Sequence, residues 1–139
     1  KNAETYISLL SDLDSWILSE VAQVPPERRK LVTDHATLDY FASEYGFEQV
    51  GLVIPSFSSN ASPSAQDLKS LEDAILAQKA PAVFLDKTAN ANLAAQVARD
   101  TGVKLVFIYT GSLSEPGGPA DNYLKFMRFN VNAIIAALK

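Results

Sequence analysis

The sequence contains no cysteine and only one histidine. Without cysteine the chain has no disulfide, no thiolate metal ligand and no cysteine nucleophile. Basic residues are outnumbered, 12 to 16, by aspartate and glutamate, and the net charge is −4. This balance argues against nucleic acid as a partner, because phosphate groups require a cationic surface. No apolar run approaches the roughly 18 residues of a membrane span, so we expect no membrane-spanning segment.

What is present is typical of a folded domain. The 139 residues are 47% apolar and 20% charged, which fits one domain that buries a core without disulfide or metal crosslinks. The chain begins at Lys1, without a methionine or a signal-like segment. We therefore expect a processed product or a piece of a longer protein.

The spacing of apolar residues predicts one helix followed by a strand–helix alternation. Residues 4–22 carry apolar side chains at spacings of three and four, and Pro25-Pro26 follows. We then expect four strands, each followed by a helix, at residues 30–33, 49–54, 82–85 and 104–109. This order predicts an α/β fold with a four-stranded parallel sheet and helices on both faces. The last strand is a continuous apolar run, as expected for a strand covered on both faces.

Local signals mark several ends of these elements. Gly46 and Gly102 stand where helices end, and Ser64 with Asp67 three residues later predicts the start of the third helix. A serine-rich loop separates that helix from the second strand.

Ligands of open parallel sheets bind beyond the carboxyl ends of the strands. This rule selects four segments, which are Thr33-Asp34-His35, Pro55-Ser56-Phe57, Asp86-Lys87-Thr88 and Thr110-Gly111-Ser112.

His35 is the principal candidate in these segments. We expect it at the N-terminus of a helix, where the helix dipole favours the neutral imidazole that a metal needs; the other interpretation is a histidine bonded to a loop. A zinc site needs three or more protein ligands, so further ligands must come from elsewhere. Asp34 is predicted to cap the following helix. Asp86 is open to three roles, as a ligand, as a support for ligands, or as an ion-pair partner of Lys87 or Arg128.

Catalytic patterns are sparse. The sequence has no Gly-x-Ser-x-Gly motif and no carboxylate pair fixed by spacing. The alternative to a binding protein is a flavodoxin-like or receiver-like signalling or enzymatic domain that uses Asp34 and Asp86. A receiver domain would place a lysine after a late strand, whereas here the strand runs into Tyr109-Thr110-Gly111.

Several blocks, in order and along residues 1–139, resemble the C-terminal half of the metal-binding receptors of zinc and manganese ABC importers. The first block, Pro25 to His35, resembles that family's entry into its second lobe. The other blocks are Asp39 to Gly46, Val83 to Asp86, Tyr109 to Ser114, Gly117 to Ala120 and Tyr123 to Val131.

The resemblance implies a two-lobed receptor whose lobes are joined by one long helix and hold the metal between them. Residues 1–24 would be the end of the connecting helix, and residues 25–139 the C-terminal lobe. The first lobe, which supplies two histidines in that family, is absent from this chain. The family implies a periplasmic or extracytoplasmic location, with or without a lipid anchor, and a membrane permease of an ABC importer as partner. It implies no enzymatic activity.

The resemblance also assigns roles at the site. His35 stands where the family has a metal ligand, and Gly111 stands where it usually has an aspartate. A nitrogen-rich site without that carboxylate favours Zn²⁺ over Mn²⁺. Asp86 replaces a glutamate and is expected to position its neighbours without touching the metal. Asp34, Gly111 and Ser112 are expected to line the cleft beside it.

Overall fold

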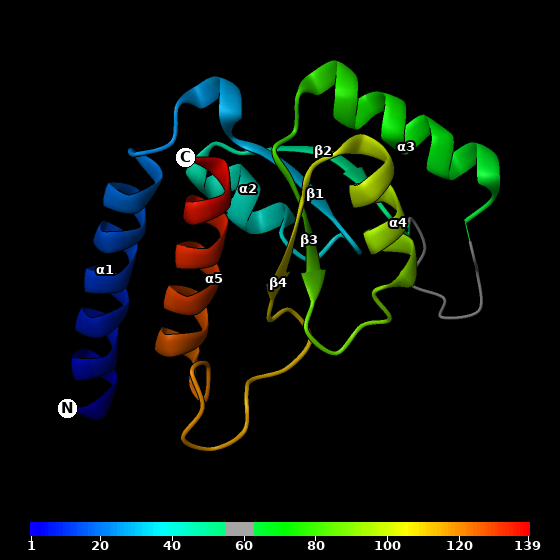
Figure 1. The fold of residues 1–139 in the computed structure, drawn as a ribbon. Helices are drawn as coiled ribbons and strands as arrows, with labels where there is room; N and C mark the ends of the chain where they lie inside the picture. The colour runs from blue at the N-terminus through cyan, green and yellow to red at the C-terminus, as the bar shows by residue number, and fades with distance from the viewer. Residues whose placement is uncertain (55–62) are drawn as a thin grey trace.

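The computed structural model describes residues 1–54 and 63–139. Within these residues, four parallel strands form one sheet in the order β2-β1-β3-β4 (Figure 1). Their bounds are Lys30–Thr33 for β1, Glu48–Leu52 for β2, Ala82–Asp86 for β3 and Lys104–Ile108 for β4. The predicted parallel α/β sheet is confirmed. The serine-rich loop and the candidate segment Pro55-Ser56-Phe57 lie outside the described residues.

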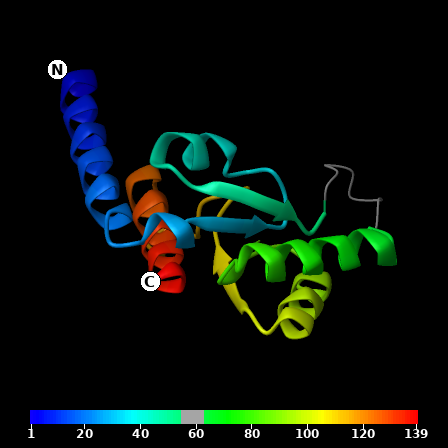
Figure 2. The ribbon, with the colours of Figure 1, turned by 90° about the horizontal axis from the view of Figure 1, so that it is seen from above.

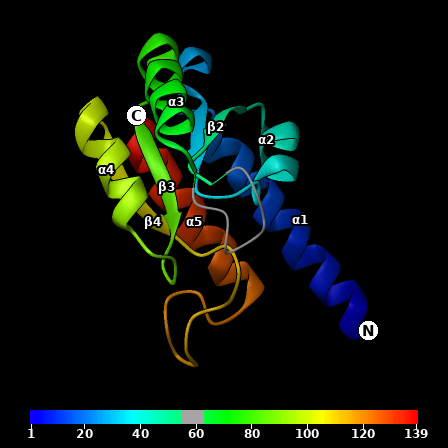
Figure 3. The same ribbon diagram turned by 90° about the vertical axis from the view of Figure 1, so that its right-hand side faces the viewer.

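In the described part of the chain, five helices cover the sheet: α1 (Asn2–Val21), α2 (Asp39–Tyr45), α3 (Ala65–Gln78), α4 (Asn92–Thr101) and α5 (Tyr123–Leu138). A short 3₁₀ turn, η1 (Pro26–Arg28), precedes β1. Helices α1, α2 and α5 share one hydrophobic core on one face, and α3 and α4 share a second core on the other. Figure 3 shows α3 and α4 on one side of the sheet and α1 and α2 on the other. Helices therefore cover both faces, as the sequence predicts.

The helix ends follow the local signals. Ser64 and Asp67 form a reciprocal capping box at the start of α3, which satisfies two backbone N–H groups that have no partner within the helix. Gly46 and Gly102 end α2 and α4 with φ angles of 71° and 72°, a left-handed conformation that glycine adopts without a steric penalty.

The prediction that the fourth strand is covered on both faces is wrong. β4 lies at the edge of the sheet, and of its five residues only Ile108 is buried; Phe107 is 42% exposed. All residues of β3 are buried, so β3 is the strand that is covered on both faces. An apolar run does not distinguish these cases, because coverage depends on strand order.

Only one half of α1 packs against the body of the molecule. Leu13, Ile17 and Val21 are buried in the core shared with α5, whereas Tyr6 and Leu9 are exposed. Figure 2 shows the N-terminal end of α1 projecting away from the sheet. Among the helices that the structure describes, none is long and apolar enough to cross a bilayer.

Candidate metal site

The ends of β1, β3 and β4 meet at one side of the sheet, which we call the carboxyl edge (Asp34-His35, Asp86, and Thr110-Gly111-Ser112). Asp34 is almost fully buried there, with 2% of its surface exposed. Its Oδ1 accepts a hydrogen bond from the backbone N–H of His35 at 3.0 Å, and its Oδ2 accepts one from the backbone N–H of Asp86 at 3.3 Å. The Asp34 carboxylate therefore joins the end of β1 to the end of β3.

The Asp86 carboxylate joins β3 to β4 in the same way. Its Oδ2 accepts hydrogen bonds from the Thr110 backbone at 2.7 Å, the Thr110 hydroxyl at 2.6 Å and the Gly111 backbone at 3.1 Å. Its Oδ1 accepts from the backbone and the hydroxyl of Thr88. Burial raises the pKa of Asp86, but the hydrogen bonds from Thr110, Thr88 and Gly111 outweigh burial and hold the pKa below its ordinary value. The carboxylate is therefore charged at neutral pH.

His35 is half-buried at this edge, directly after β1. Its backbone carbonyl accepts hydrogen bonds from the Thr33 hydroxyl and the Thr37 backbone N–H, both at 2.8 Å. Two predictions fail here. His35 does not stand at a helix N-terminus, because α2 begins only at Asp39, and Asp34 does not cap that helix, because its oxygens accept bonds from residues 35 and 86. A tight turn, held by Thr33 and Thr37, separates the strand from the helix.

Gly111 and Ser112 lie exposed at the end of β4. No atom lies within 4 Å of the place where a Cβ on Gly111 would stand. The backbone at this position therefore has room for a side chain. Gly111 and Ser112 also line a shallow hollow that Tyr123 and Phe126 complete.

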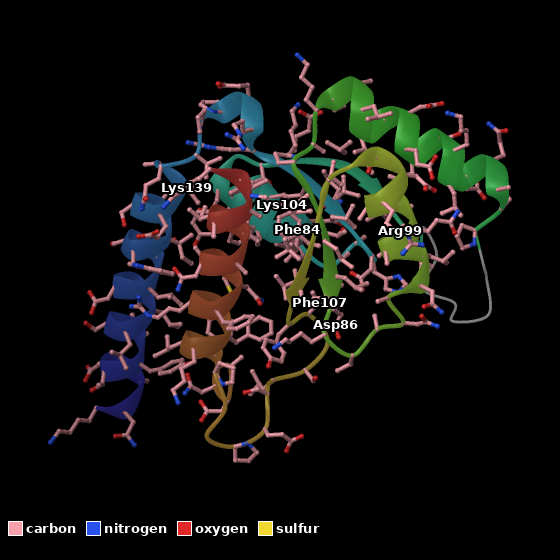
Figure 4. All side chains as sticks on the ribbon, in the orientation of Figure 1. Phe84, Asp86, Arg99, Lys104, Phe107 and Lys139 are labelled. Carbon is pink, nitrogen blue, oxygen red and sulfur yellow. The ribbon has the colours of Figure 1, made fainter. Side chains whose placement is uncertain are left out.

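The ion-pair role considered for Asp86 is not found among the described residues. The Lys87 ammonium lies over the rings of Tyr109 and Phe129, at 5.0 and 5.2 Å from their centroids. The Arg128 guanidinium lies over the Trp16 ring at 4.5 Å. Figure 4 shows Asp86 at the end of its strand.

Residues 1–54 and 63–139 contain no group of three or more histidine or carboxylate side chains that could hold a metal ion. The receiver-like alternative gains no support from the geometry. A phosphoacceptor or a Mg²⁺ site needs accessible carboxylate oxygens. Asp34 is almost fully buried, and the two oxygens of Asp86 accept five hydrogen bonds between them.

Sequence reasoning missed an aromatic groove beside this edge. It has a volume of about 380 Å³ and lies between α2 and α5, with Thr37 and Thr110 at the side of the candidate site. Its other lining residues include Tyr40, Phe41, Tyr109, Tyr123 and Phe126. The recurring aromatics of residues 40–45 and 123–129 were the available signal, although spacing alone assigns them to the core.

Comparisons with known proteins identify the family of this chain. Residues 1–137 match the family model described as "Zinc-uptake complex component A periplasmic". The chain belongs to this family. The family description places its members in the periplasm, in agreement with the extracytoplasmic location that the resemblance implies.

Individual relatives of the family carry different metals in their names. The chain is 30% identical to the "Manganese-binding lipoprotein MntA" of Halalkalibacterium halodurans, over 99% of this chain and 45% of that protein. It is 32% identical to the "Zinc-binding protein TroA" of Treponema pallidum, over 97% and 45%. A Mn-bound periplasmic metal-binding protein from Candidatus Liberibacter asiaticus superposes with a TM-score of 0.88 at 28% identity, over 99% of this chain and 51% of that one. The chain thus spans about half the length of these relatives.

Proposed function

We propose that this chain is the C-terminal lobe of an extracytoplasmic receptor that binds a divalent metal ion and delivers it to the permease of an ABC importer. The observation that carries the proposal is the position of His35. Its backbone is fixed by Asp34, Thr33 and Thr37 at the edge of the sheet where ligands bind. The function is binding and transport, not catalysis.

Zn²⁺ is the ion that the residues favour. His35 offers nitrogen, and Gly111 offers no carboxylate at the neighbouring strand end. Zn²⁺ accepts nitrogen-rich sites of four ligands, whereas Mn²⁺ prefers more oxygen ligands. Relatives with names of both kinds belong to the family, so the choice between the two ions rests on these two positions.

The remaining ligands come, in this proposal, from a first lobe that precedes the connecting helix in the complete protein. Residues 1–24 would form the end of the helix that joins the two lobes, and residues 25–139 the second lobe. Tyr40 and Tyr123 are exposed and line the aromatic groove beside the carboxyl edge, which supports a covering lobe. Closing two lobes on one ion supplies the ligands that this chain lacks.

Replacing His35 by alanine in the full-length protein tests the proposal. We expect the Zn²⁺ affinity to fall by about a hundredfold or more, since a lost ligand costs at least as much as a lost supporting residue. Asp39→Asn, an exposed change on the same segment, serves as the control and should leave the affinity unchanged. Equal affinities of the wild-type protein and the alanine variant in a competition titration would disprove the role of His35.

A titration of the 139-residue chain alone adds a second test. One imidazole cannot hold Zn²⁺ tightly, so we expect weak binding by calorimetry. Tight Zn²⁺ uptake by this chain would contradict the need for a second lobe.

A further inference from the structure

Among the described residues, the backbone of β4 pairs with only one neighbouring strand, β3. The Lys104 N–H donates to the carbonyl of Pro81, and the Ile108 carbonyl accepts from the N–H of Lys87. In a parallel pair, alternate residues direct both backbone groups to the same neighbour. Lys104, Val106 and Ile108 therefore face β3, and the residues between them face away from the sheet.

Leu105 and Phe107 are thus the residues of β4 whose backbone groups point outward. In the described part of the chain no strand pairs with this side of β4. The positions before and after are closed, because the Val103 N–H donates to the end of α4, and the Asn130 side chain bonds both the N–H and the carbonyl of Tyr109. The outer edge of β4 therefore has a window of two donors and two acceptors.

The window itself contains no proline, no charged residue and no β-bulge, which are features that protect natural edge strands. The β4 strand has no proline, pairs with β3 in unbroken register over five residues, and has one charged residue, at its start. The opposite edge strand, β2, differs, because its register with β1 shifts at Leu31/Val32 and it carries Glu48 and Gly51. The edge at β2 therefore has features that disfavour pairing with a further strand, and the window of β4 does not.

The window is complementary to itself. A two-fold axis at Val106 pairs Leu105 of each copy with Phe107 of the other in antiparallel fashion and closes four backbone hydrogen bonds. The same axis sets Lys104 opposite Ile108, so like charges do not face each other.

A shallow hollow lies beside the window. It has a volume of about 370 Å³ and is lined by small residues of α4, with Arg99, Gly102, Val103 and Leu105. Leu105 and Phe107 lie on the same face of β4, because side chains alternate along a strand. Phe107, 42% exposed, would enter the hollow of the second copy beside its pairing partner Leu105. Figure 4 labels Phe107 on β4 and Arg99 on α4, and the guanidinium of Arg99 suits the face of an aromatic ring.

We propose that the outer edge of β4 is an interaction surface for a second copy of this chain, which extends the sheet to eight strands. Antiparallel pairing directs the two carboxyl edges to opposite ends of the dimer, so each His35 stays accessible. The dimer forms without metal, and its test is independent of the metal-binding function.

Sedimentation velocity of the 139-residue chain over a range of concentrations tests the proposal. We expect the mass to rise from 15.1 kDa to a plateau at twice that value. Hydrogen exchange should show the amides of Leu105 and Phe107 slowing as the concentration rises, while those of Lys104, Val106 and Ile108 do not change.

Two variants and one control identify the surface. Phe107→Lys removes the ring and Ala95→Gln fills the hollow, and each should weaken the dimer about tenfold or more. Leu76→Lys changes another exposed apolar side chain, on α3, and should dimerise like the wild type. Urea denaturation confirms that all three remain folded. A mass fixed at 15.1 kDa up to millimolar concentration, or equal loss of the dimer in Leu76→Lys, would overturn the proposal.

Discussion

The buried carboxylate of Asp34 accepts a hydrogen bond from the backbone N–H of Asp86, with 3.3 Å between Oδ2 and N. Asp86 in turn accepts bonds from Thr110 and Gly111. Two carboxylates thus tie three neighbouring strand ends, and both are satisfied by backbone and hydroxyl donors. The place of His35 relative to Gly111 is set by this chain of contacts, since His35 is bonded to Asp34.

Replacing Asp86 by asparagine tests how much these contacts stabilise the fold. The amide would turn N–H groups toward donors of Thr88 or Thr110, and we expect the free energy of unfolding to fall by about 3 kcal/mol at neutral pH. Urea denaturation followed by the fluorescence of the single tryptophan measures it. Asp100→Asn, an exposed change at the end of α4, should have an effect within about 0.5 kcal/mol.

The effect of Asp86 depends on pH with a definite sign. Its pKa is lower in the folded protein than in the unfolded chain, so its contribution is complete above the unfolded pKa of about 4 and is lost as the pH falls toward the folded value. The difference between wild type and Asp86→Asn should therefore be constant near neutral pH and shrink below about pH 4. A difference that stays constant down to about pH 3 would mean that the carboxylate is not stabilised in its charged form.

Asn130 is a second buried polar residue with a testable role. It is 4% exposed, and its side chain bonds the Tyr109 carbonyl at 2.7 Å and the Tyr109 N–H at 2.9 Å. Asn130→Ala leaves both backbone groups without these partners, and we expect a loss of about 3 kcal/mol in the free energy of unfolding. Asn132→Ala, on the exposed face of the same helix, is the matched control. Similar stability of the two variants would show that water replaces the amide.

The capping box of α3 gives a smaller effect. Ser64→Ala removes the hydroxyl that accepts the Asp67 N–H at 3.1 Å, and we expect a loss of about 1 kcal/mol by thermal or urea unfolding. Ser70→Ala, in the exposed interior of the same helix, should be neutral or slightly stabilising because alanine favours the helix. A loss of equal size in both variants would contradict a capping role.

The sequence predicted those features that depend on neighbours along the chain. The period of apolar residues located the strands and helices, and Ser64, Gly46 and Gly102 marked helix ends, because capping is a local interaction. The strand–helix alternation also fixed the parallel class of the sheet, since the crossovers leave few other arrangements.

The predictions that failed concern features that depend on strand order and on contacts across the sheet. Asp34 is predicted to cap the helix that follows it, but its hydrogen-bond partner Asp86 lies 52 residues away along the chain. The exposure of β4 follows from its place beside β3 alone. Neither fact is encoded in a local pattern, and the turn at residues 35–38 depends on the hydroxyl of Thr33 as much as on the turn residues themselves.

Gly111→Asp tests whether the missing carboxylate determines the metal preference. The substitution is sterically open, because no atom lies within 4 Å of the new Cβ. In the full-length protein we expect the affinity for Mn²⁺ relative to Zn²⁺ to rise by about tenfold or more, since an added carboxylate supplies the oxygen ligand that Mn²⁺ prefers. Competition between the two ions at equal free concentration measures the ratio.

Gly111→Asn is the matched control for that experiment, because it has nearly the same shape without the charge. An unchanged ratio in the asparagine variant, together with a raised ratio in the aspartate variant, would assign the effect to the carboxylate. If both variants shift the ratio equally, a side chain of any kind at residue 111 alters the site, and the preference for Zn²⁺ does not arise from the absence of the acid.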